Sequence, residues 1–158
     1  MHKQPLRYRA DGTFTILQFT DLHVTSNREH AEVICGVMES ILEAERPDLV
    51  VFTGDVLYSP SCERPAEVYR ETVAVVDRTG TAWCAVFGNH DAEERTTRAE
   101  LMDVRRSLPH CYSEPGPEHL FGVGNYVLPV LGADGNGDDR VRTALYFLDS
   151  GDYIRTPY

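Results

Sequence analysis

Long apolar runs are missing from this sequence of 158 residues. No uninterrupted apolar stretch comes near the roughly 20 residues that a membrane-spanning helix requires. The first residues, Met1 to Arg9, carry Lys3 and Arg7 but lack the apolar core that defines a signal peptide. We therefore expect a protein of the cytoplasm that has no membrane partner.

Basic residues are also scarce. The chain has 15 Lys and Arg against 25 Asp and Glu, which gives a net charge of -10 and a pI near 4.9. Because binding to nucleic acid depends mainly on Lys and Arg that neutralise phosphates, this balance disfavours a nucleic-acid partner.

Cysteine is limited to four positions, and no two of them form a C-x-x-C pair: Cys35, Cys62, Cys84 and Cys111. The spacing gives no sign of a zinc or redox motif. Cys35 and Cys84 lie in apolar patterns, where small buried thiols are expected. We predict that the cysteines are reduced and structural.

Three short apolar runs predict buried strands, at 14–20, 48–53 and 81–87. Between them lie helical patterns over 28–46, where Ser26 or Asn27 can cap the start, and over 65–78. The apolar positions of these helices are Val33, Val37, Ile41 and Leu42 in the first and Val68, Val75 and Val76 in the second. The order βαβαβ predicts an α/β fold with a parallel sheet, with ligands at the carboxyl ends of the strands.

The rest of the chain predicts a third helix and a hairpin. Residues 93–98 form the charged, capped start of a helix that runs to about Ser107. Segments 125–131 and 142–148 flank a Gly- and Asp-rich loop at 132–140, as the strands of a β-hairpin do. Pro129 indicates an edge or a bulge in the first of these strands. With 42% hydrophobic residues the chain can bury one core, so we expect a single domain over 1–158.

Each of the three predicted strands ends in residues that bind metals or move protons. The segments are Phe19-Thr-Asp-Leu-His23, Thr53-Gly-Asp55 and Gly88-Asn-His-Asp91. Residues two apart on an extended chain point the same way, so Asp21 and His23 can grip one cation. Gly54 allows a sharp turn that places the Asp55 carboxylate between two metals.

The Gly88-Asn-His-Asp91 segment adds a third donor and a proton carrier. Asn89 offers a neutral amide oxygen, and His90 can serve as general acid near a leaving group. Any one of the three motifs alone would more often be strand-end capping and turn chemistry. Their joint placement at successive strand ends favours a two-metal site that clamps phosphoryl oxygens and activates water.

Together these motifs resemble the calcineurin-like metallophosphoesterases. The longer segments 18–23, 51–55, 85–91 and 145–151 are most similar to the purple-acid-phosphatase-like branch of that family. The resemblance implies the N-terminal part of a four-layer αββα sandwich. It implies hydrolysis of a phosphate ester substrate by a metal-bound hydroxide, with two ions drawn from Mn, Fe or Zn.

The resemblance also implies a role for each residue. Asp21 and His23 would bind one metal, Asp55 would bridge both and Asn89 would bind the second. His90 would be the catalytic histidine, and Asp91 would orient it.

The sequence departs from the family at its missing histidines. The family completes its site with a further histidine and a Gly-His-x-His segment, whereas the later histidines here, His110 and His119, lie in polar loops and are expected to be ordinary surface residues. Tyr58 stands at the spacing of the iron-binding tyrosinate of true purple acid phosphatases, and we interpret it as a packing residue.

These departures leave a second functional hypothesis open. The chain would then be a truncated, catalytically inactive remnant that binds metal weakly or acts as an interaction module. An incomplete second sheet would leave apolar strand edges unpaired, so we expect either a longer natural product or self-association.

Overall fold

The computed structural model describes residues 3–133 and 139–153. One sheet is parallel, with strand order β2-β3-β4, and its strands are connected through two helices. Its elements are β2 (Ile16–Phe19), α1 (Arg28–Glu45), β3 (Leu49–Phe52), α2 (Pro65–Asp77) and β4 (Ala82–Ala85). The predicted βαβαβ order is confirmed.

The predicted hairpin is confirmed in a second sheet, of order β1-β5-β6. Its strands are β1 (Leu6–Arg7), β5 (Tyr126–Leu131) and β6 (Val141–Phe147), with β5 and β6 antiparallel. Residues 134–138 of the predicted loop lie outside the described residues. Pro129 is not on an edge strand, because β5 lies between β1 and β6, but a register shift follows it at Val130 and Leu131. The sequence did not predict β1, which is too short to show a pattern.

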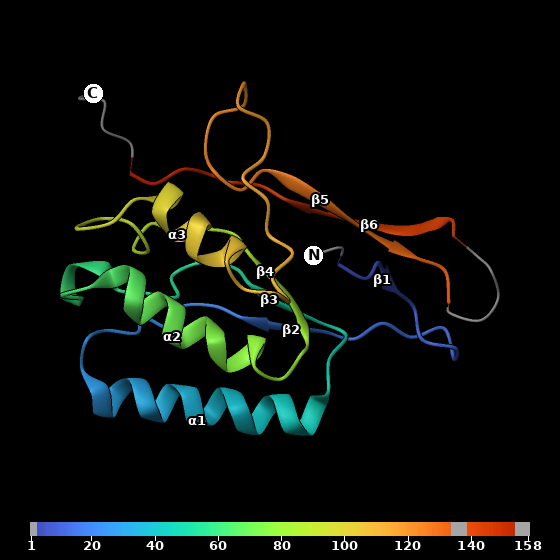
Figure 1. Ribbon diagram of the computed structural model, residues 1–158, viewed down its shortest axis with the longest axis horizontal. Helices are drawn as coiled ribbons and strands as arrows, with labels where there is room; N and C mark the ends of the chain where they lie inside the picture. Colours follow the sequence, from blue (N-terminus) through green and yellow to red (C-terminus); the bar gives the residue numbers. More distant parts are fainter. Residues whose placement is uncertain (1–2, 134–138, 154–158) are drawn as a thin grey trace.

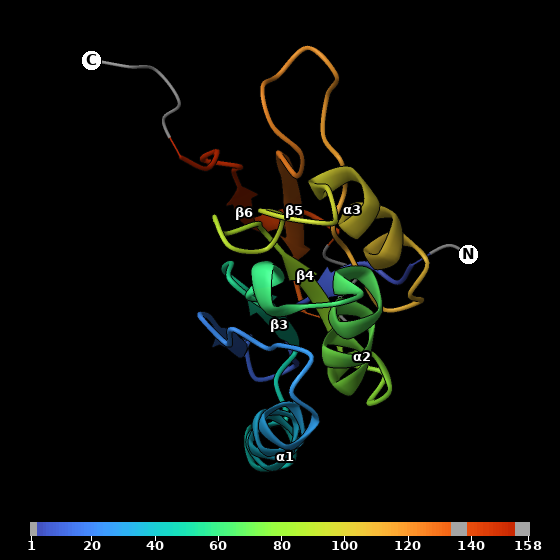
Figure 2. The same cartoon turned by 90° about the vertical axis from the view of Figure 1, so that its left-hand side faces the viewer.

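The described elements form three layers: a layer of helices, the parallel sheet and the second sheet. One apolar core lies between each pair of neighbouring layers. One core joins α1, α2 and a third helix, α3 (Arg98–Arg106), to one face of β2-β3-β4 through residues such as Met38, Val73 and Leu101. The other joins the opposite face to the second sheet, through Val51, Cys84 and Leu128 among others. In Figure 1, α1 and α2 lie on one side of β2-β3-β4 and the β5-β6 hairpin lies on the other, and Figure 2 shows the same arrangement turned by 90°.

The buried face of α1 is narrower than the apolar pattern of its sequence. Asn27 caps the helix by accepting a hydrogen bond from the backbone NH of His30. Met38 and Leu42 are buried, whereas Val33 and Val37 are 63% and 54% exposed. These two valines are exposed because the apolar pattern of the helix is wider than the stripe that α2 and the sheet cover.

Helix α3 begins later than predicted. Thr97 is its N-cap, and Thr97 and Glu100 form a capping box, so 93–97 is an irregular loop in front of the helix. A short 3₁₀ turn, η1 (Ser59–Ser61), packs against this loop: the Ser59 hydroxyl accepts a hydrogen bond from the backbone NH of Glu93. Residues 93–97 are therefore not helical and can contribute to the neighbouring motif.

The capping box gives a first prediction. Thr97→Ala should lower the free energy of unfolding by about 1 kcal/mol, because it removes a cap from a helix of nine residues. Urea unfolding followed by circular dichroism measures the change. Thr96→Ala, which removes only an exposed contact to Glu100, should have a smaller effect. Equal midpoints for Thr97→Ala and the wild type would contradict the role of the cap.

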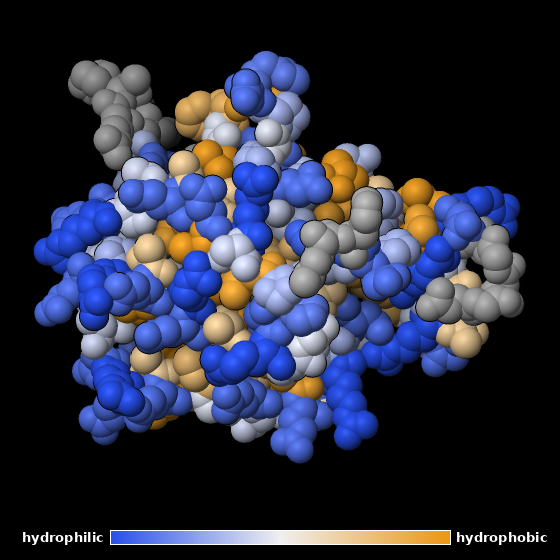
Figure 3. Space-filling model, in the orientation of Figure 1, coloured by the Kyte–Doolittle hydropathy of each residue, from blue (hydrophilic) through white to orange (hydrophobic). Residues whose placement is uncertain are grey.

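The outer face of the second sheet is partly apolar. Val127, Tyr146 and Leu148 are 45%, 71% and 68% exposed. Figure 3 shows hydrophobic side chains among the hydrophilic ones over β5 and β6. Within residues 3–133 and 139–153 no fourth layer covers this face, and self-association through it stays a prediction. Among the helices of the described residues, none combines the length and the apolar character that a membrane span requires.

Candidate metal centre

The loops after β2 and β3 run side by side because the parallel pairing continues beyond the strands. The backbone NH of Asp21 donates to the carbonyl of Gly54 at 3.2 Å, and that of His23 donates to the carbonyl of Asp55 at 3.0 Å. This pairing brings the two predicted ligands of the first loop against the predicted bridging carboxylate of the second.

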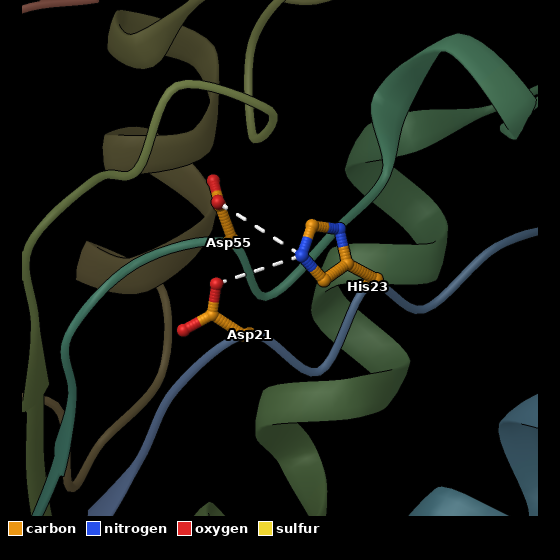
Figure 4. A group of neighbouring side chains, drawn as sticks. All are labelled: Asp21, His23 and Asp55. Atoms are coloured by element: carbon orange, nitrogen blue, oxygen red, sulfur yellow. Dashed lines mark ion pairs between the residues drawn. The ribbon is translucent and has the colours of Figure 1, made fainter.

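The three side chains converge on one point. His23 Nε2 lies 3.6 Å from Asp21 Oδ1 and 4.0 Å from Asp55 Oδ2, and Figure 4 shows both carboxylates turned toward the ring. Their ligand atoms all lie within 4.8 Å of one another. Two carboxylates and an imidazole are a donor set suited to Mn, Fe or Zn, so these residues fit a divalent cation.

The sequence predicted an extended backbone at Asp21 and His23, but the backbone of this cluster is not extended. Asp21, His23 and Asp55 have φ values of 53°, 47° and 51°, in the left-handed region. Asp and His tolerate this region better than most residues, but each such residue still costs on the order of 1–3 kcal/mol. Strained backbone gathered at one cluster is characteristic of a functional site, and here it directs the ligand atoms toward each other.

Two glycines allow the loops to approach so closely. A Cβ on Gly54, which has φ of 113°, would lie 2.7 Å from the backbone nitrogen of Gly88. A Cβ on Gly88 would lie 2.0 Å from Asp55 Oδ1. The glycines of the two motifs are therefore required by packing, since any side chain at Gly88 would displace the Asp55 carboxylate.

Asn89 lines the same cavity as Asp21 and Asp55. This cavity has a volume of about 440 Å³, and residues 150–153 line its other side. This wall was not predicted: the sequence of the segment after β6 shows similarity to the family but gives no sign of a contact with the site. Nothing in its local pattern reveals that it folds back over the loops.

The predicted contact between Asp91 and the ring of His90 is replaced by a different one. Asp91 is fully buried, and its oxygens accept hydrogen bonds from the backbone NH groups of Asp55, Leu57 and Gly88 at 3.0, 3.0 and 2.8 Å. Burial raises the pKa of Asp91. The prediction that Asp91 orients His90 was wrong, because both carboxylate oxygens hold together the backbone of the two loops.

Glu93 takes the place next to His90. Its Oε2 lies 2.7 Å from His90 Nδ1, and this hydrogen bond raises the pKa of His90. The His90 backbone NH donates to Asp55 Oδ1 at 2.9 Å, which ties the histidine to the predicted bridging ligand. The only sequence signal for Glu93 was an acidic residue three positions after the histidine, and the expected helix concealed it.

The ring of Tyr58 lies next to both histidines, and its role as a packing residue stays a prediction. Its ring centroid lies 5.2 Å from that of His90 and 6.2 Å from that of His23. His110 lies elsewhere, where its backbone NH donates to Asp77, and neither it nor His119 belongs to the cluster of three. Among the described residues, the cluster contains a single imidazole.

A buried arginine supports the end of β4, just before the Gly88 loop. Arg105 is fully buried and donates to the carbonyls of Ala85 and Val86 at 3.0 and 3.1 Å and to the Tyr69 hydroxyl at 2.7 Å. Its guanidinium also lies 3.7 Å from the centroid of the Phe87 ring. Helix α3 thus fixes the strand end from which Asn89 and His90 project.

Comparison with known proteins gives a consistent result. The sequence model for the calcineurin-like phosphoesterases matches residues 14–155. The chain is 33% identical over 99% of its length to "Probable inactive purple acid phosphatase 29" of Arabidopsis thaliana, and covers 45% of that protein. It is 32% identical over 95% of its length to "Phosphatase DCR2" of Saccharomyces cerevisiae, and covers 29% of that protein.

The chain therefore spans less than half the length of these two relatives. Among solved structures, the Pseudomonas putida nuclease MPE aligns with 74% of this chain and 58% of its own, with 17% sequence identity and a TM-score of 0.40.

Proposed function

The chain belongs to the calcineurin-like phosphoesterase family, and from this premise we propose that it is a metal-dependent phosphoric ester hydrolase with a two-metal centre. The observation that carries the proposal is the convergence of Asp21, His23 and Asp55 within 4.8 Å. A carboxylate cluster of this kind can bind cations. Bound cations would offset the negative charge of this acidic protein, which otherwise repels a phosphate ester.

We assign the ligands as follows. Asp21 and His23 would hold one cation, Asp55 would bridge it to the second, and Asn89 would offer its amide oxygen to the second. Bound Mn, Fe or Zn would supply Lewis-acid polarisation of the phosphoryl oxygens and lower the pKa of a water nucleophile. The cavity beside these residues is open to solvent and leaves room for a phosphate ester.

His90 is the proposed general acid. Its ring centroid lies 5.2 Å from that of His23, so it stands beside the proposed metal position. Because Nδ1 is hydrogen-bonded to Glu93, Nε2 is the atom available to donate a proton to the leaving-group oxygen. The raised pKa of His90 favours the protonated ring that this role requires.

A non-catalytic chain is the second candidate. It is supported by the single imidazole in the described cluster and by the names of two relatives, each called a probable inactive purple acid phosphatase.

We also propose that the protein is located in the cytoplasm. The four cysteines are free thiols, which is consistent with a reducing compartment.

Metal stoichiometry separates the two candidates. For the hydrolase we expect two Mn²⁺ ions per chain after dialysis, by elemental analysis, together with turnover of an aryl phosphate. One ion or none, without turnover, would establish the non-catalytic chain. A matched Asp103→Asn protein, altered on the exposed side of α3, should behave like the wild type in both assays.

The acid role of His90 predicts a dependence on the leaving group. His90→Ala should lower turnover of phenyl phosphate by roughly 10²- to 10⁴-fold, the usual worth of general acid catalysis. The loss should be smaller for 2,4-dinitrophenyl phosphate, whose leaving oxygen needs little protonation. Mn²⁺ content, measured in parallel, should change less than turnover. An equal loss with both esters would rule out the acid role.

A further inference from the structure

Two side-chain hydrogen bonds hold residues of the Gly88-Asn-His-Asp91 motif from outside the motif. Asn89 Nδ2 donates to the Tyr153 hydroxyl at 2.7 Å. Glu93 Oε2 lies 2.7 Å from His90 Nδ1. These two bonds tie Asn89 and His90 to two residues that lie outside every motif of the sequence.

The chemistry of the groups fixes the direction of each bond. An amide nitrogen can only donate, so the Tyr153 oxygen accepts from Asn89. An ionised carboxylate can only accept, so His90 Nδ1 carries the hydrogen that Glu93 receives. The amide of Asn89 and the ring of His90 are therefore each held in one of their two possible states.

We propose that Glu93 and Tyr153 are positioning residues of this site. Tyr153 holds the nitrogen of the Asn89 amide, so that the oxygen is the end presented to a cation. Glu93 holds His90 Nδ1–H, so that Nε2 is the atom presented to substrate. This inference rests on the proposed function, because it gives Asn89 and His90 their roles as ligand and acid.

Both positioning residues are themselves anchored. Ser59, which is fully buried, accepts from the Glu93 backbone NH at 2.9 Å and donates to the His90 carbonyl at 2.7 Å. Tyr153 follows a segment that is fixed by the ion pair between half-buried Arg98 and buried Asp149.

The same arginine ties that segment to the Asn89 loop. Arg98 donates to the carbonyls of Gly151 and Gly88, at 2.8 and 3.3 Å. Gly88, directly before Asn89, and Gly151, two residues before Tyr153, are thereby held by one guanidinium, which keeps the two side chains close to each other.

The Glu93 part can be tested without catalysis. Long-range ¹H–¹⁵N spectra of the metal-free protein, at a pH where His90 is neutral, report which ring nitrogen carries the proton. We expect the Nδ1–H form in the wild type, in Glu93→Gln, whose side-chain oxygen can still accept, and in the matched control Glu94→Gln. Glu93→Leu should lose this preference. A His90 ring that keeps the Nδ1–H form in Glu93→Leu would overturn the role of Glu93.

The Tyr153 part is tested by metal affinity. Tyr153→Phe keeps the ring but removes the hydroxyl, and it should weaken Mn²⁺ binding by roughly 10-fold or more, as loss of an outer-sphere partner commonly does. Tyr146→Phe removes a hydroxyl from an exposed position and should leave the affinity unchanged. Equal affinity in the two variants would overturn the role of Tyr153.

The two parts also separate this inference from the proposed function. If the wild type bound Mn²⁺ but hydrolysed no phosphate ester, the hydrolase proposal would fail. The tautomer of His90 and the Mn²⁺ affinity would still test both positioning roles, because neither measurement needs turnover. If the protein hydrolysed esters and the tautomer and affinity were insensitive to Glu93 and Tyr153, the positioning roles alone would fail.

Discussion

Replacing Gly88 by Ala should disrupt the proposed metal centre. The added Cβ would lie 2.0 Å from Asp55 Oδ1 and 2.5 Å from the Asp55 nitrogen, so backbone as well as side chain must move. Overpacking of this kind costs about 1–3 kcal/mol, and we expect the upper end because two loops are held by the buried Asp91 at this point. Since Asp55 is displaced, Mn²⁺ affinity should fall by roughly 100-fold.

Urea unfolding and calorimetric titration with Mn²⁺ measure the two effects of Gly88→Ala. Gly36→Ala is the matched control, because Gly36 lies within α1 and its Cβ would meet nothing within 4 Å. That control should raise stability by about 1 kcal/mol, the helix propensity difference, and leave Mn²⁺ affinity intact. Wild-type affinity in Gly88→Ala would show that the position of the Asp55 carboxylate does not matter for metal.

Asp55→Asn should remove metal binding while leaving the fold in place. The Asn side-chain oxygen can still accept from the His90 backbone NH, which Asp55 Oδ1 does at 2.9 Å, so the loop contact is kept. The charge that would bridge two cations is lost. Because outer-sphere partners alone are worth 10- to 100-fold in affinity, loss of the bridging carboxylate should cost at least about 100-fold.

Thermodynamic linkage gives a second measurement for Asp55→Asn. At a Mn²⁺ concentration of 100 times the dissociation constant, the wild type should gain about 2.7 kcal/mol in free energy of unfolding, and Asp55→Asn should gain almost nothing. Asp103→Asn makes the same charge change at an exposed site and should gain as much as the wild type. Full retention of Mn²⁺ by Asp55→Asn would show that the bridging assignment is wrong.

His90→Ala, by contrast, should leave metal in place and change the chemistry. The contrast between it and Asp55→Asn separates a proton donor from a ligand, although the two residues are joined by a hydrogen bond. Together with Gly88→Ala, these variants test the position of the bridging carboxylate, its charge and the neighbouring acid independently.

The sequence by itself determined the parallel sheet and the place of the site. Strands such as Leu49–Phe52 are short apolar runs, and a buried strand in a parallel sheet needs little more than that. Motif residues that follow such strands must meet at one edge, because parallel strands share a carboxyl end. For this reason Asp21, His23 and Asp55 could be predicted as a cluster from local patterns alone.

Only the tertiary structure decided which residues surround that cluster. Asp91 and Glu93 are both acidic and lie close to His90 in the chain, yet one holds backbone NH groups and the other holds the ring. The choice depends on where the loop after β3 passes and on the late start of α3 at Arg98. Tyr153 reaches Asn89 across a sequence separation of 64 residues, through an ion pair of Arg98 and Asp149 that no local pattern encodes. Periodicity records which face of an element is buried, whereas the partner of a polar side chain is set by long-range packing.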